Sequence, residues 1–316
     1  MLGWRVLRRH LIFLFLFFLK ILISPINPVS LGDEMMDVKL QNGQRMPLVG
    51  LGTWQMKDDV CRNAVTKALK AGYKHIDTAE HYFNEDQVRK GIEDSGVARE
   101  DIFLTTKLWI DDFGYEETLK ACDASLERLG TEYVDLYLIH WPISSSDIRS
   151  IMKAMKELLD AGKIRAFGVS NFTITHLKKA IAIGKELDLK ISANQVEFHP
   201  GLYQKELLEF CKDNDIVLTA YSPLTRGDVS ENETMKEIAE KYNKTPAQVA
   251  LRWMTEKDVV VIPKASSEGH IKENIDIEDF TLDDEDAKRI DDMGSDNRLI
   301  VPPFAEFDKE DVFPDA

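Results

Sequence analysis

The chain has 316 residues, 44% of them apolar, which is enough to bury the core of one large domain. Its 55 acidic and 40 basic residues give a net charge of −15 and a pI near 5.0. Such an acidic surface repels phosphates, which argues against nucleic acids and anionic membranes as partners. The three cysteines (Cys61, Cys122 and Cys211) form no CxxC pair, which favours a reduced, cytoplasmic protein over a disulfide framework.

Residues 1–34 form an apolar N-terminal extension that precedes the first segment with a folding pattern. Three arginines stand before an apolar run at 11–23, which only Lys20 interrupts. A basic flank and a short apolar run resemble a signal peptide or a weak anchor, but no small-residue cleavage site follows. The uncharged part is also short for a membrane span. We expect either that translation starts at Met35 or Met36, or that the extension is a dispensable membrane anchor.

From residue 35 to residue 294, short β-rich runs alternate with amphipathic helices. The first signal is a hairpin, in which alternating apolar residues flank Asn42 and Gly43. Several of the later runs are almost continuously apolar, as strands buried on both faces are. The predicted strands are 75–77, 103–108, 134–140, 166–171, 192–198, 217–223 and 259–264, with a further short one at 228–229.

The helices between these strands are marked by apolar stripes and by capping residues. Stripes run through 60–69 and 148–159, and a glycine follows each of them. Thr245 and Pro246 read as the cap and first turn of another helix.

Seven or eight strand–helix units in one domain predict a (β/α)₈ TIM barrel with an N-terminal β-hairpin cap. An open doubly wound sheet is the alternative, but no GxGxxG follows the first strand. Residues 295–316 are expected to form an irregular tail.

Polar residues end the predicted strands, at the edge where a parallel barrel carries its chemistry. Asp77, Lys107 and His140 end three successive strands. Each alone has an ordinary explanation, as a helix cap, a solvated lysine or a buried core histidine. Together they predict a ring of polar groups at one mouth of the barrel. The later strands add Ser170, Asn171, Gln195, Glu197, His199, Tyr221, Ser222 and Lys264.

These residue types suit proton transfer to a carbonyl oxygen. Asp77 and Lys107 are expected to pair, because each compensates the other's burial. A lysine ammonium beside a phenol lowers the phenol's pKa from about 10 toward working pH. Tyr82 lies five residues after Asp77, so it can reach the same mouth and act as a general acid for an alkoxide. His140 can then hydrogen-bond the carbonyl oxygen and orient it.

Seven motifs follow one another along the chain, and they include most of the polar residues at the strand ends. They are GYKHIDTAEHYFNEDQV (72–88), LTTKLW (104–109), DLYLIHWP (135–142), GVSNF (168–172), NQVEFHP (194–200), AYSPL (220–224) and VIPKASS (261–267). In sequence and in order these motifs resemble those of the aldo-keto reductase family, and the resemblance covers about residues 37–292. The short segments after Trp141 and Leu224 resemble the prokaryotic-type, short-loop members and imply an open pocket.

The resemblance implies an oxidoreductase that reduces aldehydes or ketones to alcohols by hydride transfer from NAD(P)H. It implies that Tyr82 is the proton donor, that Lys107 and Asp77 tune it, and that His140 positions the substrate. Tyr221 would stack on the nicotinamide ring. By the same resemblance, Ser170, Asn171 and Gln195 would hold the carboxamide. The phosphates, ribose and adenine would be held by Ser222, Leu224, Lys264, Ser266 and Asn274.

The cofactor motif departs from the family pattern at two positions. Ala265 and His270 stand where the family commonly has serine and arginine, and the arginine usually contacts the 2′-phosphate. A neutral histidine supplies less charge there, which implies a weaker preference for NADPH. Because Lys264 is retained, we expect NADPH, with NADH as the alternative.

Trp54, Trp109 and Trp141 line up with family positions that border the substrate. Ordinary aromatic packing is the simpler explanation, but all three adjoin motif residues, which favours an aromatic-walled pocket. The expected partner is a small-molecule carbonyl substrate, and the family pattern implies a monomer.

Two other functions fit parts of the pattern. A metal-dependent hydrolase could use His75, Asp77, His140 and His199 as ligands, although Lys107 would then place a cation beside the metal. A non-catalytic, cofactor-sensing barrel subunit is the second alternative. All four candidate catalytic residues are present, which favours an enzyme.

Overall fold

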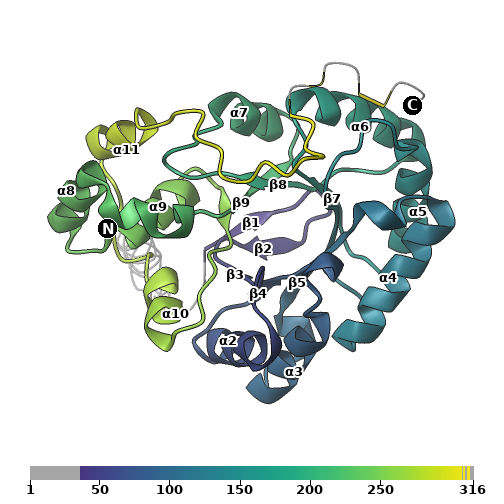
Figure 1. Cartoon of the computed structure of the whole chain (residues 1–316), viewed down its shortest axis with the longest axis horizontal. Coiled ribbons are helices and arrows are strands. Elements are labelled where there is room, and N and C mark those ends of the chain that lie inside the picture. The colour runs from purple at the N-terminus through teal and green to yellow at the C-terminus, as the bar shows by residue number, and fades with distance from the viewer. Residues whose placement is uncertain (1–35, 308, 310–311, 314–316) are drawn as a thin grey trace, which may run out of the picture. The chain divides into compact units, whose positions relative to one another are not determined.

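The computed structural model describes residues 36–307, 309 and 312–313, and the predictions for residues 1–34 lie outside them. By contacts the chain divides into two units, residues 1–35 and 36–316, and the second contains all the elements below (Figure 1). The strands are β1 (Asp37–Lys39), β2 (Arg45–Pro47), β3 (Leu51–Gly52), β4 (His75–Asp77), β5 (Phe103–Leu108), β6 (Leu136–Ile139), β7 (Phe167–Ser170), β8 (Ala193–Glu197), β9 (Val217–Tyr221) and β10 (Val260–Val261). The α-helices are α2 (Asp58–Lys70), α3 (Glu85–Ser95), α4 (Tyr115–Leu129), α5 (Ile148–Asp160), α6 (Ile174–Leu187), α7 (Lys205–Asp213), α8 (Glu233–Tyr242), α9 (Pro246–Thr255), α10 (Glu268–Ile275) and α11 (Asp284–Asp291).

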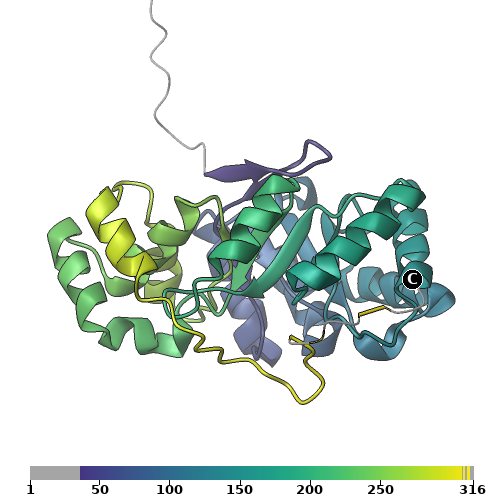
Figure 2. The ribbon, with the colours of Figure 1, turned by 90° about the horizontal axis from the view of Figure 1, so that it is seen from above.

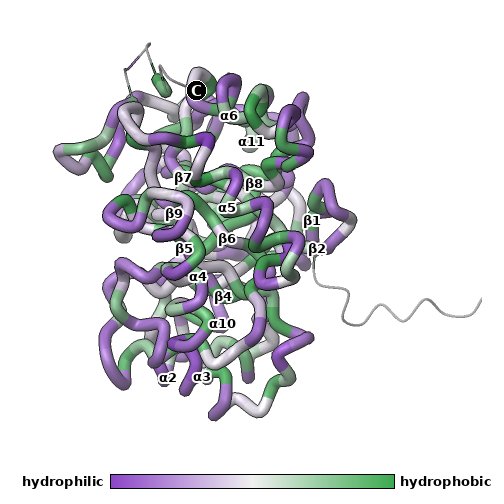
Figure 3. The backbone as a smooth tube through the Cα atoms, turned by 90° about the vertical axis from the view of Figure 1, so that its right-hand side faces the viewer, coloured by the Kyte–Doolittle hydropathy of each residue, from purple (hydrophilic) through white to green (hydrophobic). Residues whose placement is uncertain are grey.

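Within the described residues, eight parallel strands form one sheet in the order β3 to β10, with helices around it (Figure 1). The two ends of the sheet meet, because Val49 bridges Val261 in parallel and Gly50 donates its N–H to the Val261 carbonyl at 2.8 Å. The predicted (β/α)₈ barrel is therefore confirmed. Figure 3 shows hydrophobic strands such as β6 inside and hydrophilic stretches on the surrounding helices.

Strand β3 is the one barrel strand that the sequence analysis missed, because two residues carry no periodic signal. Its Gly52 packs so closely on β10 that a Cβ atom would lie 2.6 Å from the Ile262 carbonyl oxygen. The predicted strand at 228–229 is wrong, because those residues lie in the 3₁₀ helix η4 (Thr225–Glu231). The eighth strand of the barrel is β3, and residues 228–229 take no part in the sheet.

The helix predictions are confirmed at α2, α5 and α9. The α9 helix begins with a capping box, in which Thr245 and Gln248 each accept the other's backbone N–H, and Pro246 follows the cap. The side chain of Asp147 caps α5 by accepting the Ser150 N–H at 3.0 Å. These caps satisfy N–H groups that the first turn leaves unpaired, so each helix begins at a defined residue.

The predicted hairpin is the antiparallel pair of β1 and β2, and it covers one end of the barrel, opposite the C-terminal tail (Figure 2). Leu40 and Met46 from the hairpin join a buried cluster with inward-facing strand residues such as Phe103 and Leu138. This plug closes that end with apolar side chains. The polar strand ends therefore face a cavity only at the other end.

Among the described residues, none of the helices combines the length and the hydrophobicity that crossing a membrane requires.

Candidate active site

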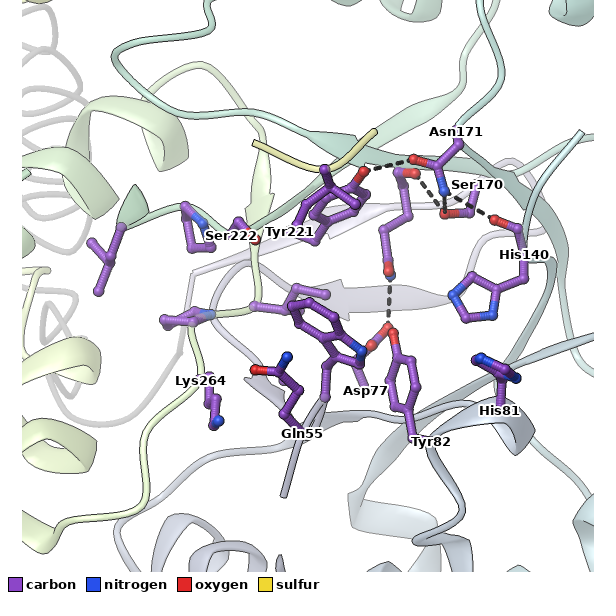
Figure 4. Close-up of a pocket in the computed structure, with 18 of the residues that line it drawn as sticks. Gln55, Asp77, His81, Tyr82, His140, Ser170, Asn171, Tyr221, Ser222 and Lys264 are labelled. Carbon is purple, nitrogen blue, oxygen red and sulfur yellow. Dashed lines mark hydrogen bonds between the residues drawn. The ribbon is translucent and has the colours of Figure 1, made fainter. Parts of the chain in front are cut away.

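A cavity of about 770 Å³ lies at the C-terminal ends of the barrel strands (Figure 4). It extends from Asp77 and His140 to Lys264 and Asn274. Almost all of the residues predicted from the sequence line it. They are Trp54, Asp77, Tyr82, Trp109, His140, Trp141, Ser170, Asn171, Gln195, Tyr221, Ser222, Leu224, Lys264, His270 and Asn274.

Lys107 is the fully buried centre of the candidate catalytic group. Its Nζ donates three hydrogen bonds, to Asp77 Oδ1 at 2.6 Å, to the Thr78 carbonyl at 2.8 Å and to Tyr82 Oη at 3.2 Å. An ammonium has three protons, so all of its donors are used. The predicted pairing of Asp77 with Lys107 is confirmed, and the same ammonium holds the Tyr82 hydroxyl.

The Asp77 carboxylate is held on both oxygens. While Oδ1 accepts from Lys107, Oδ2 accepts from Gln195 Nε2 at 2.7 Å. Burial raises the pKa of Asp77, whereas the Lys107 ammonium opposes that shift. Burial also lowers the pKa of Lys107, and Asp77 opposes it. Because each charge depends on the other, loss of either one leaves an unpaired buried charge.

The Tyr82 hydroxyl accepts from Lys107 and donates to no other described residue, so its own proton is free to point into the cavity. The prediction that the phenol's pKa is lowered from about 10 toward working pH is wrong for this structure. Burial, with the neighbouring Asp77 carboxylate, raises the pKa of Tyr82 well above its usual value. The phenol therefore keeps its proton at neutral pH, as a proton donor must before it acts.

His140 lines the same side of the cavity, and its ring lies 5.6 Å from that of Tyr82 in an edge-on arrangement (Figure 4). Burial, followed by the charge on Lys107, lowers the pKa of His140 well below its usual value. A neutral imidazole carries one N–H donor and no charge. His140 can therefore hydrogen-bond a substrate oxygen.

Three polar residues at the ends of β7 and β9 form a connected group beside His140. Asn171 Nδ2 donates to the His140 carbonyl at 3.0 Å and to Ser170 Oγ at 3.1 Å. Tyr221 Oη in turn donates to Asn171 Oδ1 at 2.8 Å. Asn171 has φ of +65°, a strained conformation of the kind that gathers at functional sites. The group presents amide edges and an aromatic ring beside Tyr82 and His140, which suits a flat heteroaromatic ring with an amide.

The other end of the cavity carries a lysine ammonium and one carboxylate, that of Glu273. Lys264 is exposed, lines the cavity and forms no ion pair with any described residue. His270 and Asn274 line the cavity beside it. An unpaired ammonium at this end fits the phosphates of a dinucleotide. Ser266 is the exception among the predicted contacts, because it is not among the cavity-lining residues.

The three predicted tryptophans line the cavity, and the C-terminal tail adds a wall to it. Phe304 packs edge-on against Trp109 at 5.8 Å and against Trp141 at 5.5 Å. Ile300 and Pro302 also line the cavity, whereas the short loops had implied an open pocket. The tail is irregular, as expected, but nothing in its sequence indicated that it reaches the site.

The sequence analysis also missed two residues that line the cavity, His81 and Gln55. His81 stands next to Tyr82 in the quoted motif.

Glu197 and His199 do not belong to the ring of polar groups predicted at the mouth. They pair with each other at 3.0 Å, and Glu197 also accepts the backbone N–H groups of Leu299 and Ile300. Neither residue lines the large cavity. Their role is to attach the tail to β8, so the prediction that they face the site is wrong.

Glu80 joins the loop that carries Tyr82 to the loop that follows Lys107, because its carboxylate accepts the Trp109 backbone N–H. Burial raises the pKa of Glu80 from 4.5 to about 7. Between those pH values the folded protein holds one more proton than the unfolded chain, so stability falls as pH rises. We expect the Glu80→Gln variant to lack this term. The wild-type free energy of unfolding, relative to that of Glu80→Gln, should fall by up to about 1.4 kcal/mol per pH unit across this window. Urea unfolding from pH 4.5 to pH 8 measures it, and parallel curves for the two proteins would contradict it.

The metal-ligand set that the alternative hydrolase requires does not assemble. Among the described residues, no three His, Cys, Asp or Glu side chains are grouped so that they could hold a metal ion. His75 does not line the cavity, and its Nε2 lies 3.2 Å from Thr105 Oγ1. His199 is paired with Glu197.

Comparisons with known proteins agree with this geometry. The model of the Aldo/keto reductase family matches residues 48–295. Glyoxal reductase of Bacillus subtilis is 48% identical over 277 residues, which cover 87% of this chain and 98% of the relative. Glycerol 2-dehydrogenase (NADP(+)) of Saccharomyces cerevisiae is 41% identical and covers 89% of this chain and 99% of the relative. A crystal structure of an aldo-keto reductase enzyme from a Medee basin deep-sea metagenome library has a TM-score of 0.81 and 44% identity, and the match covers 86% of this chain and 98% of that one.

Proposed function

The chain belongs to the aldo/keto reductase family, and we propose that it reduces small aldehydes and α-dicarbonyl compounds with NADPH, using Tyr82 as the proton donor. That it is an oxidoreductase which reduces carbonyl compounds with NAD(P)H follows from the family itself. The proposal adds the residues, the preferred nucleotide and the substrate class. We also propose that it works as a cytoplasmic monomer, with a catalytic unit at residues 35–294 and a tail at 295–316.

One observation carries the assignment of Tyr82. The Lys107 ammonium donates to Asp77, Thr78 and Tyr82 at once, so the phenolic oxygen is an acceptor and its proton is left for the cavity. A hydroxyl held in this way donates in one direction only. The neutral His140 beside it offers a second donor to the substrate oxygen that accepts the Tyr82 proton.

These residues account for the proton half of the reduction. A bound reduced nicotinamide supplies the hydride to the carbonyl carbon. As the carbonyl oxygen gains charge, the O–H bond of Tyr82 breaks and the proton passes to that oxygen, which gives the alcohol and a phenolate. Lys107 stabilises the phenolate from 3.2 Å, which offsets the high pKa of Tyr82 at the moment of transfer. Asp77 keeps that lysine charged and in place.

The cofactor assignment rests on the charge at the far end of the cavity. Lys264 is unpaired among the described residues and lines the cavity, so it can meet a phosphate. We assign the nicotinamide end to Ser170, Asn171, Gln195 and Tyr221, because their amide edges and ring fit it. NADPH is preferred because Lys264 is retained, and one relative is named for NADP(+). The adenine end falls to Ser222, Leu224, His270 and Asn274, with Ser266 the least supported contact.

The substrate class rests on the walls of the cavity and on the relatives. Trp54, Trp109, Trp141 and Phe304 line the same cavity as Tyr82 and His140, so compounds of modest size fit there once a dinucleotide occupies the remainder. A relative that is 48% identical is named glyoxal reductase, and glyoxal is a two-carbon dicarbonyl. Small aldehydes and dicarbonyls are therefore the substrates to test first.

His270 sets how strongly the enzyme prefers NADPH over NADH. It is exposed, and it lines the cavity beside Lys264. An arginine there adds a permanent charge and a planar set of donors for the 2′-phosphate. We expect His270→Arg to raise the NADPH-to-NADH ratio of kcat/KM by about tenfold, which corresponds to a charge-assisted hydrogen bond. Initial rates with both nucleotides measure the ratio, and His270→Gln is the uncharged control. An unchanged ratio in the arginine variant would place the 2′-phosphate elsewhere.

The proposed function is tested by initial-rate assays of the full chain with NADPH and with NADH. The panel comprises propanal, benzaldehyde, glyoxal, methylglyoxal and a keto sugar. We expect turnover of at least the aldehydes and dicarbonyls. No turnover of any compound, with nucleotide binding intact, would instead support a non-catalytic, cofactor-sensing subunit.

A further inference from the structure

His81 is a cavity-lining residue to which the reduction described above gives no role. It lies in the 3₁₀ helix η1 (Glu80–Tyr82), directly before Tyr82, and its side chain points to the cavity beside His140 (Figure 4). Its ring stacks on Trp109, with centroids 3.5 Å apart and planes 9° from parallel. Trp109 in turn meets His140 edge-on at 5.1 Å. His81 is thus two aromatic contacts away from the group that receives the carbonyl oxygen.

Hydrogen bonds join the two segments that carry His81 and Trp109. Glu80 accepts the Trp109 backbone N–H, so the residue before His81 is tied to the residue that His81 stacks on. Thr106, next to Lys107 on β5, donates to the buried Glu85 at 2.6 Å, which ties the same two segments together again. The segments that carry the two stacked rings are therefore joined without a ligand, and a polar edge mounted on such a pair is pre-organised for binding.

The polar edge of His81 is unused. In the described part of the chain, neither ring nitrogen of His81 has a hydrogen-bond partner, although the ring lines the cavity. Partial burial lowers the pKa of His81, so the ring is neutral and offers one N–H donor. Stacking on Trp109 needs only an aromatic ring. The nitrogen atoms are what stacking leaves unexplained.

We propose that His81 binds the second oxygen of substrates that carry a carbonyl or hydroxyl group on the carbon next to the reacting carbonyl. In such a substrate, Tyr82 and His140 hold the oxygen that is reduced, and His81 donates to its neighbour. Residues from one short segment, Glu80 to Tyr82, then hold both oxygens of an α-dicarbonyl or α-hydroxyaldehyde. This inference rests on the proposed function, because it assigns a substrate oxygen in the same site.

The test compares two substrates that differ by one oxygen, methylglyoxal and propanal. The selectivity is the ratio of their kcat/KM values with NADPH, and intrinsic reactivity and hydration cancel when the ratio is compared between variants. His81→Phe keeps an aromatic ring on Trp109 but removes the donor. His81→Gln keeps a donor but removes the aromatic ring.

We expect His81→Phe to lower the selectivity for methylglyoxal by about three- to tenfold, the range for one neutral hydrogen bond. His81→Gln should retain more of that selectivity than His81→Phe does. Equal selectivity in the wild type and His81→Phe would overturn the proposal. That includes the case in which kcat/KM of His81→Phe falls by the same factor for both substrates. Neither result would touch the proposed function, which fails only if the wild-type enzyme reduces no carbonyl compound. Binding of NADPH, followed by fluorescence, checks that each variant is folded.

Discussion

Replacing Tyr82 by phenylalanine should lower kcat by about 10²- to 10⁴-fold while the affinity for NADPH changes little. That range is typical for the loss of a positioned general acid. The variant loses one hydroxyl, which accepts from Lys107 at 3.2 Å and whose proton is free for the cavity. The aromatic ring and its edge-on contact with His140 remain, so the shape of the site is kept. Initial rates give kcat, and quenching of protein fluorescence by NADPH gives the affinity.

Tyr137→Phe is a matched control for this experiment. Tyr137 is a fully buried tyrosine on β6, and its hydroxyl has no hydrogen-bond partner in the described structure. It does not line the cavity, so its loss removes the same atom away from the chemistry. We expect kcat of this variant to stay near the wild-type value. If Tyr82→Phe and Tyr137→Phe were equally active, Tyr82 would not be the acid.

Replacing Lys107 by methionine should destabilise the fold by about 3–5 kcal/mol, the usual cost of leaving one half of a buried ion pair unpaired. Asp77 is fully enclosed, and its Oδ1 would lose its only charged partner. The same variant should also lose most of its activity, because no cation remains to stabilise the Tyr82 phenolate. Urea unfolding measures the free energy of unfolding, and initial rates measure the activity.

The double variant Asp77→Asn with Lys107→Met separates these two effects. Removing both charges leaves a neutral amide that can still accept from Gln195, so much of the lost stability should return while activity stays low. Lys264→Met serves as the control for stability, because Lys264 is exposed and should change the free energy of unfolding by less than about 0.5 kcal/mol. A Lys107→Met protein as stable as the Lys264→Met protein would show that the buried pair does not hold the fold together.

The candidate catalytic group was predictable because its members are few and stand at the ends of predicted strands. Asp77, Lys107 and His140 end successive strands, and parallel strands bring their C-terminal ends to one edge. The pKa of Tyr82 was not predictable in the same way. Its direction is set by the balance of its surroundings, in which burial and the Asp77 carboxylate both raise the pKa. That balance is a property of distances, which residue types alone do not contain.

The residues that the sequence analysis misplaced all depend on contacts between distant segments. Glu197 is turned away from the cavity because it binds the backbone at Leu299 and Ile300, about 100 positions later. Phe304 becomes part of the aromatic wall only when the tail crosses the barrel mouth to Trp109 and Trp141. A tail without periodicity carries no signal of where it packs, because its position is set by its partners.

The sequence by itself determined the alternation of strands and helices, the barrel, the family and the four candidate catalytic residues. These follow from local periodicity and from motif spacing, both of which are written along the chain. Only the tertiary structure decided which Lys107 proton goes to which acceptor, that Tyr82 keeps its proton, that Phe304 closes one wall and that His81 stacks on Trp109 with its nitrogens unused. The reason is that hydrogen-bond direction, desolvation and stacking depend on three-dimensional separations of a few ångströms, and spacing along a chain does not specify them.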